Sequence, residues 1–422
     1  MSSEYLREYS ELEIAKTVLA LIFTGRTVRY AVSIFLVIAF LYWLPAAVAG
    51  HLQSPPFAYF DQLAEAFLHG RLYLLSPPVT HDLTFSQGNW YIPFSPLPAL
   101  LMLPWVYLFG EINTVYFTII MGAINAVLVF LLLQSLHDLE QIFLKNEDKL
   151  WIVFFFSLGT GHWYLSTVGA VWFTSQICAV TFILLALWLV ASQKSPIWVG
   201  GALSLAMLAR PHVALLYPLL LAIAIAHRRL RNSQGPYFYP KWMVLSLLPM
   251  IFMVGLLLTY NSLRFGNAFD FGYRTENVSE NLVHSLSTYG QFSSHYIARN
   301  LYVMLAALPR WNVEQSWFTP DWEGMSLLIT SPALIFLYKG RPNTALALGA
   351  WLSVGLVLIP LIMYYNTGRD QFGYRFSMDF IGPVLILLAK GFTKEVTKNL
   401  RALIVLSIAM NTWGVICFHR LY

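Results

Sequence analysis

Apolar stretches long enough to cross a membrane recur along the whole of this chain. Hydrophobic residues make up 58% of its 422 residues and charged residues only 11%, whereas a soluble domain carries about 25% charged residues. A soluble fold of this composition would have to expose much of its apolar surface to water. The sequence therefore predicts an all-α, polytopic membrane protein.

The predicted spans follow from the length of each apolar segment. A spanning helix needs about 20 apolar residues, and about eleven segments approach that length. They lie near 30–49, 114–136, 151–168, 171–192, 197–210, 212–226, 242–263, 324–338, 344–364, 379–390 and 402–418. The pair at 197–226 could instead be one helix kinked at Pro211. We expect a cytoplasmic segment at 1–29, an uncleaved first helix, and a single transmembrane domain at 30–422.

Positive charge predicts how these spans are oriented. With the N-terminus in the cytoplasm, the inside loops are 1–29, 137–150, 193–196, 227–241, 339–343 and 391–401. All nine lysines and eight arginines, 17 of the 26 basic residues, fall in these loops or at their edges, as the positive-inside rule requires. This distribution explains the net charge of +5 without a nucleic-acid partner. Cys178 and Cys417 lie in apolar stretches and predict neither a disulfide framework nor a metal site.

The long outside segments, at about 50–113, 265–323 and 365–378, are where a functional site is expected. In the first, apolar residues at positions 60, 63, 64, 67 and 68 form one helical stripe. Such a short helix should lie in the membrane surface. Asp61 and Glu65 are four residues apart and share its polar face. Both are candidate catalytic acids, although a polar face in contact with solvent is the alternative, above all for Glu65.

A second part of the same segment holds another candidate acid. His81 and Asp82 precede a Gly-Asn turn and an aromatic, proline-rich run. The apolar stretch from Pro98 to Gly110 would be only about 18 Å long as a helix, too short to span. We expect an interfacial or re-entrant helix there, which would hold the acidic loop against the membrane surface.

The later outside segments supply arginines. Arg274 and Arg310 lie in the second and Arg369 and Arg375 in the third. Arginine suits two-pronged recognition of phosphate or carboxylate, but these residues could equally be interfacial anchors at helix ends. Arg375 and Asp379 are four residues apart and could pair where a helix starts.

Several function classes lack support in the sequence. It contains no phosphate-binding glycine loop, HExxH zinc motif or GxSxG elbow. A transporter coupled to protons or ions would carry acids or broken helices at mid-membrane, and charged residues within the predicted spans are few. His212, beside Arg210 and Pro211, comes nearest to that pattern and is interpreted as a helix end.

Four sequence stretches carry a resemblance to a known family. They are YFDQLAEAFLHGRLYL, HDLTFSQGNWYIPFSPLPALLMLP, LRFGNAFDFGY and QFGYRFSMDFIGP, in this order and all on the predicted outer side. Together with the topology, they make the chain resemble the GT-C membrane glycosyltransferases over nearly its whole length. The likeness is strongest to the bacterial branch related to polyprenyl-phosphate-sugar and protein O-mannosyl transferases (the glycosyltransferase 39-like group).

The resemblance implies a reaction and a set of roles. Such enzymes move a sugar from a polyprenyl-phosphate carrier to a glycan, lipid or protein acceptor at the outer membrane face, here that of a bacterial cytoplasmic membrane. It implies Asp61 as the general base, with Asp82 as the second choice and Glu65 assisting. It implies that Arg375 holds the carrier phosphate. Some members also bind a divalent cation, Mg²⁺ or Mn²⁺. The further substrate-binding candidates are Tyr374, Arg274, Arg310, Arg369 and His81.

One departure from the family pattern concerns the base. Related sequences often open the first outer loop with two adjacent acids, whereas this chain has Pro56, Phe57, Ala58 and Tyr59 there. The chemistry nevertheless suits the residue types present. A carboxylate can take the proton of an acceptor hydroxyl, and arginines can stabilise the leaving phosphate. Direct displacement through an oxocarbenium-like state would invert the sugar.

Two other functions remain open at this stage. A lipid or sugar transporter or flippase would need polar residues lining a path through the spans. A non-catalytic assembly subunit that keeps the fold would explain the missing acidic pair.

Overall fold

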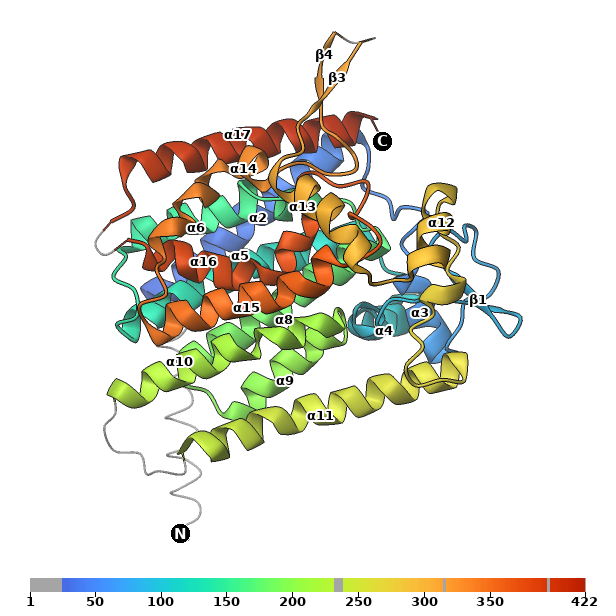
Figure 1. Cartoon of the computed structure of the whole chain (residues 1–422), viewed down its shortest axis with the longest axis horizontal. Helices are drawn as coiled ribbons and strands as arrows, with labels where there is room; N and C mark the ends of the chain where they lie inside the picture. The colour runs from blue at the N-terminus through green and yellow to red at the C-terminus, as the bar shows by residue number, and fades with distance from the viewer. Residues whose placement is uncertain (1–24, 231–237, 314–315, 393–394, 422) are drawn as a thin grey trace.

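The computed structural model describes residues 25–230, 238–313, 316–392 and 395–421, and it is mainly helical. Most of the predicted N-terminal segment lies outside these residues. The long helices lie side by side in roughly the same direction, and the strands are short and lie at one end or at the edge of the bundle (Figure 1).

Six helices in the described part of the chain are long and apolar enough to cross a membrane. They are α2 (Arg26–Ala49), α5 (Thr114–Asp138), α8 (Val171–Ala191), α11 (Phe238–Phe265), α15 (Ala345–Ile362) and α17 (Lys398–Leu421). Each coincides with a predicted span, so these six predictions are confirmed. The chain is an integral membrane protein.

The other five predicted spans are not single helices of spanning length. They form α6 (Asn146–Leu158) with α7 (His162–Leu165), α9 (Pro196–Met207), η1 (Pro211–Leu216) with α10 (Tyr217–Leu230), α14 (Leu327–Thr330) with η4 (Pro332–Lys339), and η5 (Arg375–Phe380) with α16 (Ile381–Lys390). Six of the eleven predicted spans are therefore continuous helices of spanning length, and whether the other five cross the membrane stays a prediction. Pro211 and Pro332 each start a new helical piece, since proline cannot continue a preceding helix. Such breaks are tolerated where protein, not lipid, surrounds the backbone.

Close packing around α8 holds the bundle together. Most of α8 is buried, between α5 on one side and α9 on another. On its other side α9 meets α11, where a Cβ at Gly200 would overlap the carbonyl oxygen of Ser246. Only glycine permits this approach of the two backbones. The remaining faces of α11 expose apolar side chains, as lipid contact requires.

One end of the bundle, here called the loop end, carries the predicted outer segments. Its elements are α3 (Phe60–Leu68), β1 (Thr84–Ser86), β2 (Asn89–Tyr91), α4 (Leu97–Phe109), η2 (Tyr273–Thr275), α12 (Glu280–Tyr289), η3 (Ser294–Tyr296), α13 (Ile297–Leu305), β3 (Arg310–Asn312) and β4 (Trp317–Thr319). The strands form two antiparallel hairpins, β1–β2 and β3–β4. Helices α2, α11 and α15 end there, and α5 and α8 begin there (Figure 1).

The two short helices predicted in the first outer segment are confirmed. Helix α3 spans residues 60–68 and α4 spans residues 97–109. They pack against each other, burying Phe60, Leu63 and Ala64 of α3 as the predicted stripe requires. Leu68, which the stripe also included, is exposed.

Candidate functional site

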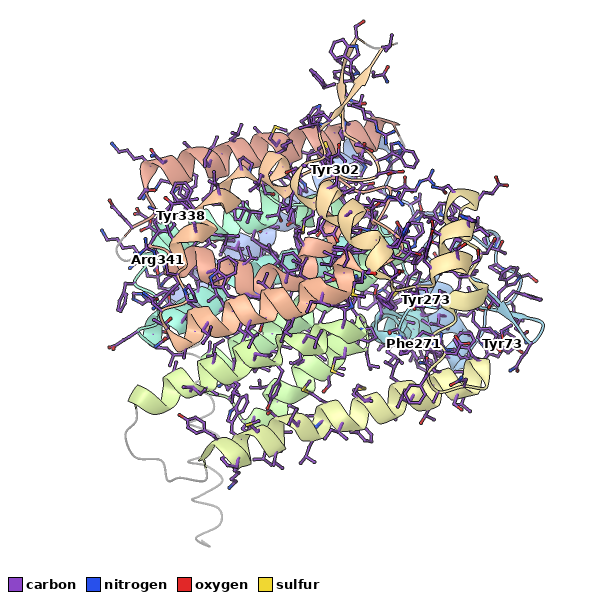
Figure 2. The ribbon with its side chains drawn as sticks, in the orientation of Figure 1. Tyr73, Phe271, Tyr273, Tyr302, Tyr338 and Arg341 are labelled. Atoms are coloured by element: carbon purple, nitrogen blue, oxygen red, sulfur yellow. The ribbon has the colours of Figure 1, made fainter. Side chains whose placement is uncertain are left out.

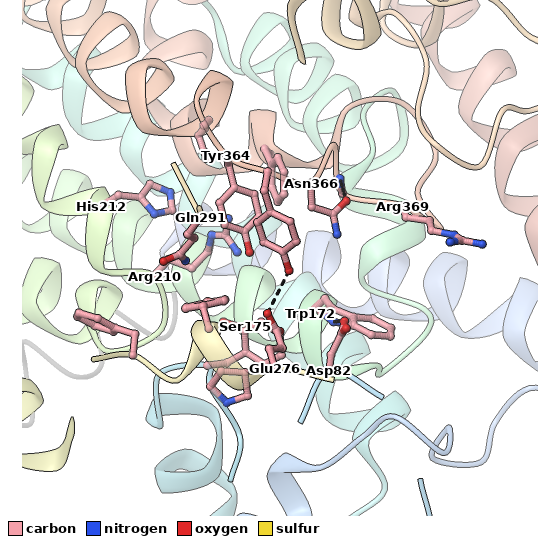
Figure 3. A pocket seen from close by; sticks show the side chains of 18 of the residues that line it. Asp82, Trp172, Ser175, Arg210, His212, Glu276, Gln291, Tyr364, Asn366 and Arg369 are labelled. Atoms are coloured by element: carbon pink, nitrogen blue, oxygen red, sulfur yellow. Dashed lines mark hydrogen bonds between the residues drawn. The ribbon is translucent and has the colours of Figure 1, made fainter. Parts of the chain in front are cut away.

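A cavity of ≈ 320 Å³ opens at the loop end of the bundle. Its walls come from all three predicted outer segments, from the first turn of α8 and from the chain that follows α9. Figure 3 shows acidic and basic side chains lying on different sides of this cavity. We call the side with Asp82 and Glu276 the acidic wall, and the side with Arg210, His212 and Arg375 the basic wall.

Backbone hydrogen bonds join two distant loops to form the acidic wall. The backbone N–H of Asp82 donates to the carbonyl oxygen of Asn277 at 2.9 Å, and the N–H of Asn277 donates to the carbonyl oxygen of Leu83 at 2.8 Å. The hydroxyl of Thr84 donates to the carbonyl oxygen of Gly272 at 2.7 Å. These bonds bring Asp82 and Glu276 to one wall, although nearly two hundred residues separate them.

Asp82 is held by its neighbours from both sides. Its Oδ2 accepts a hydrogen bond from Trp172 Nε1 at 2.8 Å, and its Oδ1 lies 3.6 Å from His81 Nε2. Its backbone has a φ of 56°, an uncommon value for a residue other than glycine. Burial raises the pKa of Asp82 above its usual value, while His81, Trp172 and Arg375 partly offset the shift. A carboxylate with a raised pKa is better matched to proton transfer near neutral pH.

Glu276, on the same wall, is more deeply buried. Its Oε2 accepts a hydrogen bond from the hydroxyl of Tyr365 at 3.0 Å, drawn as a dashed line in Figure 3. Burial, followed by the nearby charge of Asp82, raises the pKa of Glu276 well above its usual value. Two acids so placed favour opposite protonation states. Glu276 is the one suited to hold a proton and donate a hydrogen bond into the cavity.

On the basic wall, Asp379 holds the side chains of Arg210 and His212 in place. Its Oδ2 accepts from Arg210 Nε at 2.8 Å and lies 2.9 Å from His212 Nε2. Its Oδ1 accepts from Gln176 Nε2 at 3.1 Å. Asp379 itself is fully buried. This carboxylate thus neutralises Arg210 in part and aims Arg210 and His212 at the cavity.

Arg375 has no such carboxylate partner. Its Nε donates to the carbonyl oxygen of Gly368 at 2.6 Å, and its ring neighbours are Phe173 and Phe376. No described residue accepts a hydrogen bond from either of its Nη groups. Burial and the nearby Arg210 lower the pKa of Arg375 to about 10, which still leaves it charged at neutral pH. The basic wall therefore presents a guanidinium whose Nη groups are not bonded to any described residue, and guanidinium is well suited to bind a phosphate.

Four of the predicted site residues line this cavity: His81, Asp82, Arg369 and Arg375. Arg369 lies toward the rim and points away from the other labelled side chains (Figure 3), with its guanidinium 3.9 Å above the ring of Trp322.

Four others lie outside the lining. Asp61 is partly buried on α3, and Glu65 on the same helix is exposed. Arg310 lies on β3, where its Nε donates to Asp321 Oδ2 at 2.6 Å. Tyr374 is buried beside a small separate pocket. The side chain of Arg274 lies outside the described part of the structure.

Sequence reasoning missed half of the cavity's charged groups. Glu276 and Asp370 carry no local signal that separates them from other loop acids. Arg210 and His212 did carry one, because they end a predicted span on the outer side, but they were interpreted as a helix end alone. Asp379, expected to pair with Arg375, instead binds Arg210 and His212.

The cavity does not offer a ready divalent-cation site. Among the described residues, no three His, Cys, Asp or Glu side chains lie close enough together to hold a metal ion. Asp82 is already bonded to Trp172, and Glu276 to Tyr365. Binding of Mg²⁺ or Mn²⁺ by this protein stays a prediction.

Comparisons with known proteins give one distant likeness. No protein-family profile and no curated protein matches the chain. Among solved structures, it is similar to ArnT from Cupriavidus metallidurans, crystallised bound to undecaprenyl phosphate. The identity is 14% and the TM-score 0.46, over 87% of this chain and 60% of ArnT. This chain thus corresponds to less than two thirds of that protein, and the likeness assigns it no activity.

Proposed function

We propose that this membrane protein is a GT-C type glycosyltransferase, which moves a sugar from a polyprenyl-phosphate carrier to an acceptor hydroxyl or amide. The observation that carries the proposal is that one cavity is lined both by a buried acid of raised pKa, Asp82, and by Arg375, whose Nη groups have no hydrogen-bond acceptor among the described residues. Transfer from a lipid phosphate needs these two groups, a base for the acceptor and a cation for the leaving phosphate. The charge pattern of the sequence favours an active site facing outside, and the family resemblance favours a bacterial cytoplasmic membrane.

In this proposal Asp82, not Asp61, is the general base. Asp82 takes the proton from the acceptor oxygen as that oxygen attacks the anomeric carbon. Trp172 donates to one carboxylate oxygen, which orients the other toward the acceptor. Asp61 does not serve as the base in this proposal, because its side chain does not line the cavity.

The leaving group departs toward the basic wall. As the new bond to the acceptor forms, the bond from the anomeric carbon to the phosphate oxygen breaks, and its electron pair stays on the phosphate. The Nη groups of Arg375 then stabilise the developing charge, with Arg210 beside them. Attack opposite to departure gives a product of inverted configuration.

The remaining lining suits a sugar carried on an apolar chain. Protonated Glu276 can donate a hydrogen bond to a sugar hydroxyl, and Trp172 offers a flat aromatic face. Phe94, Phe271 and Phe292 line further parts of the same cavity. They supply the apolar surface that a polyprenyl chain requires.

A transfer assay tests the proposal. The purified protein in lipid nanodiscs is offered radiolabelled polyprenyl-phosphate hexoses and pentoses, with a membrane extract as acceptor source. We expect transfer from one of these donors by the unmodified protein, and none by Asp82→Asn. A folded, monodisperse protein that turns over no lipid-linked donor would contradict the proposal and favour transport or assembly.

A further inference from the structure

The β3–β4 hairpin carries an aromatic pair that the bundle leaves exposed. In its register Trp311 lies opposite Phe318, with the two ring centroids 5.0 Å apart. These side chains are nevertheless 54% and 56% exposed, and Val313 next to them is 79% exposed. A two-stranded hairpin with its rings in water is marginal. Some further surface is therefore needed to cover it.

The direction of the hairpin indicates which surface that is. Figure 1 shows β3–β4 projecting sideways, across the direction of the long helices, beside the C-terminal end of α17. The β1–β2 hairpin instead projects beyond the loop end, roughly along the helices. Since the long helices cross the bilayer, a segment that projects across them near their ends lies at the depth of the membrane interface. Tryptophan and other amphipathic rings are enriched at that depth.

The elements beside the hairpin also expose apolar side chains. Helix α13 leads into it and exposes Tyr302 and Leu305, and the connection to β3 exposes Leu308. Figure 2 places Tyr302 near the base of the hairpin. The neighbouring helix α17 exposes Ile416 near its C-terminal end. Exposed apolar side chains are therefore present on α13, on the connection to β3 and near the end of α17.

The base of the hairpin reaches the cavity rim. Arg310 pairs with Asp321 at 2.6 Å and faces the ring of Trp322 at 5.7 Å. Arg369, which lines the cavity, stacks on the same ring at 3.9 Å. Whatever fixes the hairpin would therefore also fix this part of the rim.

We propose that the β3–β4 hairpin is a membrane anchor whose Trp311–Phe318 pair and Val313 insert among the phospholipid headgroups and upper acyl chains at the loop end. The partner is the lipid surface itself, and the anchor steadies the loop that carries Arg369. This inference does not depend on the reaction proposed for the cavity.

Depth-dependent fluorescence quenching tests the anchor. Cys178 and Cys417 are replaced by alanine, and Val313→Cys is labelled with an environment-sensitive fluorophore in phosphatidylcholine nanodiscs. Spin-labelled lipids quench from within the bilayer, and iodide quenches from water. The matched control is Phe85→Cys on the β1–β2 hairpin, where the native side chain is 50% exposed.

We expect lipids labelled near the headgroup to quench the Val313 site at least twofold more than the Phe85 site, with the opposite order for iodide. Equal quenching by iodide at both sites, with none by spin-labelled lipid, would place the hairpin in water and overturn the proposal. It would then point to a protein partner. In the same labelled protein, Trp311→Asp with Phe318→Asp should abolish the lipid quenching. Unchanged quenching in that variant would remove the aromatic pair from the anchoring role.

Discussion

The two walls of the cavity are held in place by different means. The acidic wall is made of loops, which hydrogen bonds between residues 82–84 and 272–277 join to each other. Its Asp82 contacts the bundle through the hydrogen bond from Trp172 of α8. The basic wall is fixed to the bundle, because Asp379 and Gln176 tie Arg210 to η5 and α8. In the proposed reaction, the basic wall, which is fixed to the bundle, holds the carrier phosphate. The acid on the loops contacts the acceptor.

The largest expected effect is on the acidic wall. Asp82→Asn should lower the rate of sugar transfer by about 10²–10⁴-fold, since an amide cannot take the acceptor's proton. The rate is measured at saturating donor. Asp61→Asn is the matched control and should retain nearly full activity. The reverse pattern, with Asp61→Asn inactive, would return the base to α3.

The next largest effect is expected on folding stability, when Asp379, which holds Arg210 and His212 in the basic wall, is changed. Asp379 is fully buried and Arg210 largely so, so Asp379→Asn leaves Arg210 without its anion, and breaking a buried pair typically costs about 3–5 kcal/mol of folding stability. Thermal unfolding in detergent should show a clear fall in midpoint. Asp321→Asn breaks the exposed pair with Arg310 and should cost about 1 kcal/mol or less. Equal midpoints for the two variants would mean that Asp379 does not anchor the wall.

Arg375→Ala should weaken carrier binding more than it weakens the fold. A hydrogen bond to a charged group is worth about 1.5–3 kcal/mol, so the Kd for polyprenyl phosphate should rise about 10–150-fold. Native mass spectrometry or a fluorescent-lipid titration measures this Kd. The control is Arg310→Ala, which removes an arginine outside the cavity lining. If both variants bind as the unmodified protein does, Arg375 does not hold the phosphate.

The smallest expected effect is on the pKa of Asp82. The hydrogen bond from Trp172 lowers the pKa of Asp82, so Trp172→Phe should raise that pKa. A base works only when it is deprotonated, and the acid limb of the pH–rate profile should therefore move to higher pH. Trp105→Phe, on the exposed side of α4, should leave the profile unchanged. A shift to lower pH in Trp172→Phe would contradict the assigned hydrogen bond.

The helices of the bundle could be predicted from sequence wherever the length of an apolar segment is enough to identify a spanning helix. The six long helices match predicted spans because a run of about 20 apolar residues needs no knowledge of its neighbours. The other five segments form short or interrupted helices, and their length in sequence does not distinguish them from spanning helices. In η5 and α16, nearly every residue is buried among other helices, and a buried apolar segment looks the same in sequence whether its helix is continuous or not.

The segments that build the site could be predicted from the sequence, but only some of the residues that line the cavity could. Helix α3 was predicted correctly. The position of Asp61, however, depends on how α3 packs against α4, and the apolar periodicity of α3 does not show which helix it packs against. Glu276 comes beside Asp82 only through the backbone bridge between residues 83 and 277. Such contacts between distant loops leave no local pattern. Arg210 lies at the predicted outer end of a span, and this position was the one sequence feature that could have identified it as a site residue.

The proposal that the two walls serve one reaction is tested most directly by a single-turnover measurement. Enzyme in excess is loaded with the labelled donor found in the transfer assay, acceptor is added, and transfer is followed in Asp82→Asn beside the unmodified protein. We predict that Asp82→Asn binds the donor with unchanged affinity and does not pass on the sugar. Transfer by Asp82→Asn at the rate of the unmodified protein would show that the acidic wall does not supply the base.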